Sequence, residues 1–261
     1  MIPSAQPYIL IGMHRSGTSM LAELLHSSGI FMGNDREKNS ESVLFQRIND
    51  ELLRQAGFSW ANPGVPAASK AIKLSTLRVV RRFIVPQRNP VEFARLMRGK
   101  PWGWKDPRNT FTLDHWLKIF PEAKMIHIYR NGMDVALSLY HRNLKRDRNS
   151  GSYQKVLETK AGSLDLWEKY VAQAFSFEPR LGARMLTLQF EKIIASDAEE
   201  VRKLEQFTGL SLHGKIVSMA DQTRTARYQQ GEHDDLVEYA QKSVWMKKLG
   251  YVGAGQFSAT R

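Results

Sequence analysis

The first 28 residues constrain the fold more than any other part of the chain. Residues 8–12 are an apolar run typical of a short buried strand, and residues 12–19 are a turn containing Gly12 and Gly17. Residues 19–28 repeat apolar side chains with the period of a helix. A strand that passes through a glycine-containing loop into a helix is the unit from which parallel α/β sheets are built. We therefore expect an α/β fold that begins almost at the first residue.

The loop itself predicts an anion-binding site, because backbone N–H groups and the helix dipole converge at a helix N-terminus. Its spacing resembles the nucleotide phosphate loop, G-x-x-x-x-G-K-[ST], but Thr18 stands where the lysine should be. Phosphoryl transfer uses that lysine together with Mg²⁺. Here the cation is Arg15, earlier in the loop. A sulfuryl group bonded to a phosphate carries less charge than a γ-phosphate and suits such a loop without a metal. A nucleotide-dependent kinase of the P-loop class is the alternative.

Strand-like and helical patterns alternate along the rest of the chain. The further strands are expected at residues 101–105, 124–129 and 184–188. The further helices are expected at residues 41–56, 70–85, 110–120, 133–144, 164–177, 198–208 and 236–249, with residues 210–235 irregular. This alternation predicts one domain over residues 1–261, with a parallel, doubly wound sheet of the nucleoside triphosphate hydrolase-like class.

Composition limits the partners. The formal net charge of +12, from 38 Lys and Arg against 26 Asp and Glu, favours an anionic partner such as a nucleic acid, a membrane surface, a polyanionic cofactor or an acidic polysaccharide. No nucleic-acid-binding motif is present, so a nucleic-acid partner is not expected. The absence of cysteine excludes disulfides and thiolate chemistry. No apolar stretch approaches the roughly 20 residues of a membrane span, and no signal peptide is recognised, so we expect a cytoplasmic protein without a transmembrane segment.

Residues 14–19 resemble the 5′-phosphosulfate loop of sulfotransferases that use 3′-phosphoadenosine-5′-phosphosulfate (PAPS), P-[KR]-[SG]-G-T-[TS]. The resemblance implies that Arg15 replaces the catalytic basic residue of this family. The residues that it assigns to the cofactor in this loop are Arg15, Ser16, Gly17, Thr18 and Ser19.

Residues 126–140 are similar to the family's 3′-phosphate element, in which a strand ends in arginine and a serine follows eight residues later. Arg130 and Ser138 keep that spacing, and a guanidinium with a hydroxyl suits a phosphate monoester. The family's C-terminal R-K-G clamp on this phosphate is not found. Arg224 and Arg227 are candidates to replace it.

Two shorter segments extend the resemblance. Residues 104–108, W-K-D-P-R, resemble a block found in many bacterial sulfotransferases, which implies that Lys105 lies near the sulfate. Residues 188–193 look like the family's [RK]-Y-E-D-L segment, which implies that Phe190 lies against adenine in place of a tyrosine. These motifs imply transfer of a sulfuryl group from PAPS to a hydroxyl or amine, with release of 3′,5′-ADP and no metal.

The resemblance leaves the general base open. The cytosolic branch uses a histidine where this chain has Pro107, and the carbohydrate branch uses a glutamate after the first helix. Glu41 is favoured, and the alternatives are Glu37, Asp106 and His14. With Arg15 and Lys105 stabilising the leaving group, Glu41 completes the predicted catalytic set.

The acceptor is predicted only as a saccharide, lipid or small metabolite. The basic segment at residues 70–98 suggests an anionic acceptor. Trp60, Trp102 and Trp167 either stack on sugars or fill the core.

Overall fold

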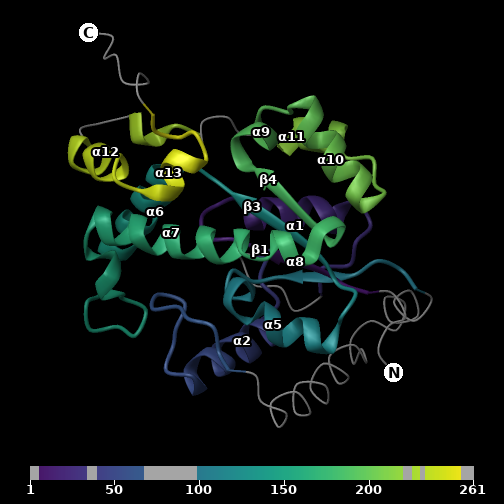
Figure 1. Ribbon diagram of the computed structural model, residues 1–261, viewed down its shortest axis with the longest axis horizontal. Helices are drawn as coiled ribbons and strands as arrows, with labels where there is room; N and C mark the ends of the chain where they lie inside the picture. Colours follow the sequence, from purple (N-terminus) through teal and green to yellow (C-terminus); the bar gives the residue numbers. More distant parts are fainter. Residues whose placement is uncertain (1–5, 34–39, 68–98, 220–224, 230–232, 254–261) are drawn as a thin grey trace.

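In the described part of the chain, four parallel strands form a sheet at the centre of the molecule (Figure 1). The computed structural model describes residues 6–33, 40–67, 99–219, 225–229 and 233–253. The strands are β1 (Tyr8–Ile11), β2 (Gly103–Lys105), β3 (Lys124–Tyr129) and β4 (Met185–Gln189). Their order in the sheet is β2-β1-β3-β4, and every pairing is parallel. The predicted parallel α/β fold is confirmed.

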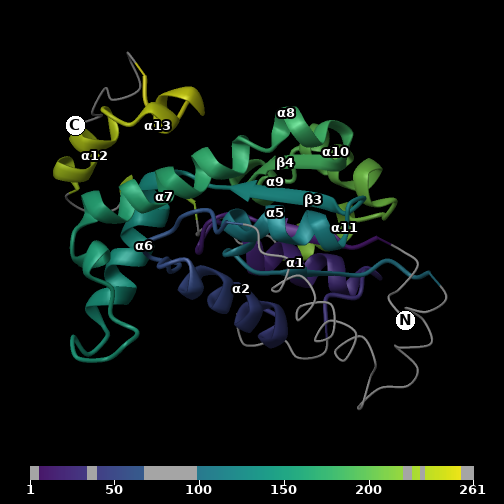
Figure 2. The same cartoon turned by 60° about the horizontal axis from the view of Figure 1, so that its bottom comes forward.

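Helices cover both faces of the sheet, because side chains of β1 alternate between two apolar layers. Tyr8 and Leu10 face one layer, whereas Ile9 and Ile11 face the other. The first layer contains α1 (Thr18–Ser27), α9 (Phe190–Ile194), α10 (Ala198–Thr208) and α11 (His213–Met219). The second contains α2 (Val43–Gln55), α5 (Asn109–Ile119), the end of α7 (Lys160–Phe175) and α8 (Glu178–Leu181). Figure 2 shows the sheet between α7 and α1.

A third apolar cluster joins α6 (Gly132–Leu144) to the first part of α7 and to the two last helices, α12 (Asp234–Ala240) and α13 (Val244–Lys248). Short 3-10 turns complete the described elements: η1 (Lys155–Glu158), η2 (Gly182–Arg184) and η4 (Arg227–Gln229). The predicted helix at residues 70–85, and the basic segment at 70–98 that contains it, lie outside the described residues.

The prediction of one helix over residues 236–249 was wrong, because the chain forms α12 and α13 with a break between them. Ser243 caps α13, its hydroxyl accepting a hydrogen bond from the Met246 N–H at 3.1 Å. The Trp245 N–H donates to the Glu168 carboxylate of α7 at 3.0 Å. Apolar periodicity continues across the break, but the cap and the contact with α7 supply better partners for these N–H groups than one continuous helix would.

The expectation of an irregular segment over residues 210–235 was also wrong in part, because α11 lies within it. The Glu205 carboxylate of α10 accepts hydrogen bonds from the N–H groups of Leu212 and His213, at 2.6 and 3.1 Å, and so caps the start of α11. Ile216 then packs into the layer around α1. A carboxylate from another helix stabilises α11, which local periodicity could not reveal.

The carboxyl ends of β1 and β3 lie side by side, and the chain leaves them in different directions. After β1 it enters α1 on one face, and after β3 it continues through α6 into α7 on the other face. Ligands of open α/β sheets bind where adjacent strands diverge in this way. We therefore expect the ligand site at the carboxyl ends of β1 and β3.

Candidate active site

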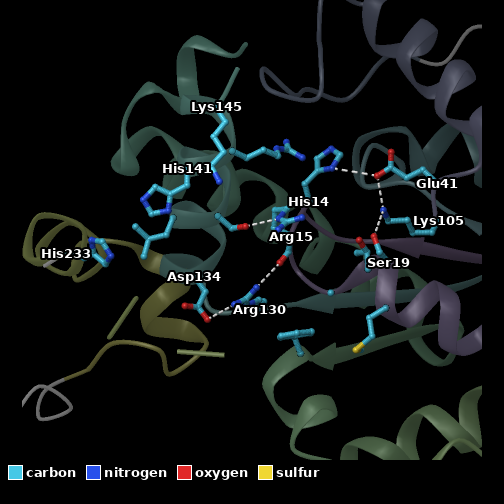
Figure 3. A pocket seen from close by; sticks show the side chains of 17 residues that line it. His14, Arg15, Ser19, Glu41, Lys105, Arg130, Asp134, His141, Lys145 and His233 are labelled. Atoms are coloured by element: carbon cyan, nitrogen blue, oxygen red, sulfur yellow. Dashed lines mark hydrogen bonds and ion pairs between the residues drawn. The ribbon is translucent and has the colours of Figure 1, made fainter. Parts of the chain in front are cut away.

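A cavity of about 950 Å³ opens at this edge (Figure 3). Among the described residues, its lining has five Lys and Arg side chains and two carboxylates, so it favours an anion. The cations are Arg15, Lys105, Arg130, Arg142 and Lys145, and the acids are Glu41 and Asp134.

Two glycines give the loop after β1 its shape. A Cβ at Gly12, whose φ is +132°, would lie 2.5 Å from the Ile128 carbonyl oxygen of β3. A Cβ at Gly17, whose φ is +92°, would overlap the Phe190 ring. Gly17 precedes α1 and has no side chain to cap it. Thr18 at the start of α1 lines the cavity, which places the N-terminal dipole of α1 at the cavity wall.

The loop after β1 contacts the segment after β3 across the cavity. Arg15 Nε donates to Ser138 Oγ of α6 at 2.8 Å. Arg130 Nη1 donates to the Arg15 carbonyl oxygen at 3.3 Å, and Arg130 Nη2 donates to Asp134 Oδ2 at 2.9 Å. The two anion-binding segments inferred from the sequence, Arg15 in one and Arg130 in the other, therefore line one cavity.

Lys105 and Glu41 form a buried ion pair on the other wall, with Lys105 Nζ 2.8 Å from Glu41 Oε1. Lys105 Nζ also donates to Ser19 Oγ at 3.4 Å, which joins the end of β2 to the start of α1. Burial lowers the pKa of Lys105, while the Glu41 carboxylate opposes that effect.

His14 lies beside this pair, its Nδ1 3.8 Å from Glu41 Oε1. Burial, and then the charges of Arg108, Lys105, Arg142 and Arg15, lower the pKa of His14 well below its ordinary value. The imidazole is therefore neutral near pH 7 and is a weak base.

Residues 7–214 match the model of the sulfotransferase family. The chain belongs to this family. It is therefore a sulfotransferase, and the kinase alternative that the loop alone left open does not hold.

Solved structures share the fold of this sulfotransferase. The sulfotransferase domain of the Synechococcus PCC 7002 olefin synthase is 17% identical, with 92% of this chain and 87% of that chain covered and a TM-score of 0.53. A sulfotransferase from Alicyclobacillus acidocaldarius is 18% identical, with 91% of this chain and 90% of that chain covered and a TM-score of 0.51. A comparison with curated protein sequences found no match.

In this sulfotransferase, Phe190 lines the cavity as the first residue of α9. The Arg130 guanidinium carbon lies 5.1 Å from the centre of the Phe190 ring. Ser16 differs from the other residues of 14–19, because its side chain is fully buried and does not line the cavity. Its N–H donates to the Met13 carbonyl oxygen at 3.2 Å, so Ser16 shapes the loop from inside.

The candidates for the general base do not all line the cavity. Asp106 is fully buried, bonds Asn49 and Arg108, and does not line the cavity. Glu37 lies outside the described residues. Glu41 and His14 both line the cavity.

The arginines and tryptophans that the sequence suggested as further cofactor or acceptor contacts are not among the described residues that line the cavity. Arg224 and the Arg227 side chain lie outside what the structure describes. Trp102 and Trp167 fill the core, whereas Trp60 is half-buried beside His14 and Arg142.

Apart from Ser138, a stripe of polar residues on α6 and its C-terminal cap was not among the predicted site residues. Ser138, Arg142 and Lys145 recur at intervals of four and three residues and line the cavity together. That spacing puts side chains on one face of a helix, so the signal was visible once Ser138 had been assigned. His233, just before α12, also lines the cavity and had no sequence signal.

The described part of the chain lacks two features, a metal-binding cluster and a helix able to span a membrane. In residues 6–33, 40–67, 99–219, 225–229 and 233–253, no group of three His, Asp or Glu side chains could hold a metal ion. Among the helices of the same part of the chain, none has the length and apolar character needed to cross a bilayer.

Proposed function

We propose that this sulfotransferase transfers a sulfuryl group from PAPS to an acceptor hydroxyl or amine and releases 3′,5′-ADP. The observation that carries the proposal is the convergence of Arg15 and Arg130, from segments 115 residues apart, on one cavity. A doubly phosphorylated nucleotide needs anion sites at two separate ends. The helix N-terminus with Lys105 supplies one, and Arg130 with Ser138 supplies the other.

The cofactor roles follow from these positions. Thr18, Ser19 and the N–H groups at the start of α1 bind the 5′-phosphate. Arg130 and Ser138 bind the 3′-phosphate, and the Phe190 ring packs against adenine. When bound, PAPS supplies a sulfuryl group linked to its 5′-phosphate. Arg15 and Lys105 offset the negative charge that develops on the leaving phosphate oxygen, which lowers the barrier when their contacts strengthen in the transition state.

We assign the general base to Glu41. A base must reach the proton of the acceptor, and Asp106 is enclosed in a hydrogen-bond network away from the cavity. The lowered pKa of His14 makes its imidazole a poor proton acceptor. The ion pair with Lys105 holds the Glu41 carboxylate beside Ser19, at the end of the cavity where transfer is proposed to occur.

Thermal unfolding with different nucleotides tests the proposal. At about one hundred times its Kd, 3′,5′-ADP should stabilise the fold by about 2.7 kcal/mol, which raises Tm by roughly 5–10 °C. ATP with Mg²⁺ and a short DNA oligonucleotide serve as comparisons. Stabilisation by ATP with Mg²⁺ but not by 3′,5′-ADP would contradict the proposal.

A variant extends the same experiment to the 3′-phosphate. Arg130→Ala should weaken 3′,5′-ADP at least tenfold while changing the affinity for adenosine 5′-phosphosulfate much less. Arg202→Ala removes the same charge from an exposed position of α10 and is the matched control. An equal loss for both nucleotides would assign Arg130 a role other than binding the 3′-phosphate.

A further inference from the structure

Arg142 and Lys145 add positive charge to the cavity beyond the residues assigned to the cofactor. Arg142 lies in the last turn of α6 and Lys145 caps that helix. Within the described parts of the chain, the side chains of both residues lack a hydrogen bond or an ion pair, and Arg142 contacts the Trp60 ring instead. Burial, Arg146 and Arg15 lower the pKa of Arg142, and the Glu41 carboxylate opposes them from beyond ion-pair distance. A half-buried guanidinium with no ion pair among the described residues is stabilised when an anion joins it.

Arg142 lies one turn of α6 beyond Ser138 and two turns beyond Asp134, the residue that bonds Arg130. Arg130 is bonded to Asp134, in the first turn of α6. Eight residues separate Asp134 from Arg142, which is about 12 Å along a helix axis. Ser138 lies midway between them. The α6 stripe therefore offers one anion contact near Arg130 and another, farther along, at Arg142.

The surroundings of Arg142 point to the acceptor. Its guanidinium carbon lies 5.6 Å from the centre of the Trp60 ring, and that ring packs edge-on against His14 with their centres 4.9 Å apart. His14 in turn lies beside Glu41. Tyr170 fixes this arrangement, its hydroxyl donating to the Trp60 carbonyl oxygen at 2.9 Å. Trp60 thus holds Arg142 on the side of the cavity where the proposed base lies.

We propose that Arg142, with Lys145, binds an oxyanion of the acceptor, so that the substrate is a hydroxyl or amine compound bearing a carboxylate, sulfate or phosphate group. The proposal rests on the proposed function, because it uses Glu41 to locate the reacting end of the acceptor. A guanidinium binds such a group with two parallel hydrogen bonds, which also orients the acceptor. The exposed Lys145 adds attraction for an arriving anion.

A second-anion titration tests this site without knowledge of the full acceptor. The enzyme is saturated with 3′,5′-ADP, and its Tm is followed against sodium sulfate at constant ionic strength. We expect a saturable rise for the wild-type chain, and an apparent sulfate affinity at least tenfold weaker for Arg142→Gln. Arg142→Lys keeps the charge but not the paired N–H donors of the guanidinium, so its sulfate affinity should lie between those of wild type and Arg142→Gln. Arg202→Gln on α10 is the charge-matched control and should behave as wild type.

The outcomes separate the two proposals. An equal sulfate response in wild type and Arg142→Gln overturns the acceptor site, because sulfate then binds elsewhere. Loss of 3′,5′-ADP affinity in Arg142→Gln, beyond about twofold, also overturns it by assigning Arg142 to the nucleotide. Retained nucleotide affinity shows that the variant is folded. A wild-type chain that fails to bind 3′,5′-ADP contradicts the proposed function itself.

Matched acceptors give a second readout. For pairs that are turned over and differ only in an anionic group, such as methyl β-glucuronide and methyl β-glucoside, we expect kcat/KM to favour the charged member by about tenfold or more. Arg142→Gln should lose that preference while keeping its affinity for 3′,5′-ADP. A wild-type preference for the neutral member would overturn the proposal.

Discussion

At the scale of single residues, the Lys105–Glu41 ion pair contributes both to the stability of the fold and to the proposed reaction. Both side chains are almost completely buried, yet both line the cavity. Each charge is expensive to bury alone, so the partner holds it in place. The same arrangement keeps an ammonium group beside Ser19 and the start of α1, where we propose that the leaving group lies.

A double-mutant cycle should detect this coupling. We expect Lys105→Met and Glu41→Gln each to lower the free energy of unfolding by about 3 kcal/mol, because each leaves a buried charge without its closest partner. The double variant should lose less than the sum of the two. Urea unfolding at pH 7 measures all four proteins. Strict additivity would mean that the pair contributes no coupling to stability.

At the scale of elements, the junction of β1 and α1 depends on backbone contact rather than on a side chain. Gly12 lies against the Ile128 carbonyl oxygen of β3, and its N–H donates to Thr110 Oγ1 at 3.1 Å. The loop can follow β1 without strain only because this position lacks a Cβ. A glycine that follows a helix, such as Gly57 after α2, is needed for its positive φ alone.

Two alanine substitutions should separate these effects. Gly57→Ala has open space around the new Cβ, so only the strain of its positive φ counts. We expect it to lower the free energy of unfolding by about 1 kcal/mol. Gly12→Ala should cost about 3 kcal/mol or more, because a backbone clash adds to the strain. Urea unfolding of both variants is the measurement. Equal losses would show that the loop can move away from β3 at little cost.

At the scale of the whole molecule, two apolar layers enclose the sheet, and a histidine is buried on one of its strands. His127 of β3 packs edge-on against Phe175 of α7, with ring centres 5.2 Å apart. Its Nδ1 has no hydrogen-bond partner among the described residues, and burial lowers its pKa to about 3. The folded protein therefore keeps this imidazole neutral in mild acid, whereas the unfolded chain protonates it below about pH 6.5.

The stability of the fold should consequently fall as the pH decreases from 7 to 5. The unfolded chain binds more protons in this range, so the free energy of unfolding rises with pH. For His127 alone the loss at pH 5 is about 2 kcal/mol. We expect the stability of His127→Phe, measured relative to wild type by urea unfolding, to improve by about that amount between pH 7 and pH 5. Other titrating groups are common to both proteins and cancel in the difference. Parallel pH profiles would contradict the prediction.

The sequence determined the features that depend on neighbouring residues. Apolar periodicity predicted the strands and most helices of the described chain, and the two glycines predicted the anion-binding turn. Motif spacing also selected Arg130 and Ser138, because eight residues across a strand end and a helix define their separation. The prediction of one domain over residues 1–261 and of a cytoplasmic location stays a prediction.

Only the tertiary structure decided the contacts between distant segments. Glu41 lies just before α2 and Lys105 ends β2, 64 residues away, so the two side chains meet only in the folded chain. The start of α11 and the break before α13 depend on carboxylates from other helices, Glu205 and Glu168. Periodicity records which face of an element is apolar, but not which polar group another element will bring to it. For that reason the contact between Arg142 and Trp60, on which the proposed acceptor site depends, emerged only when the chain was folded.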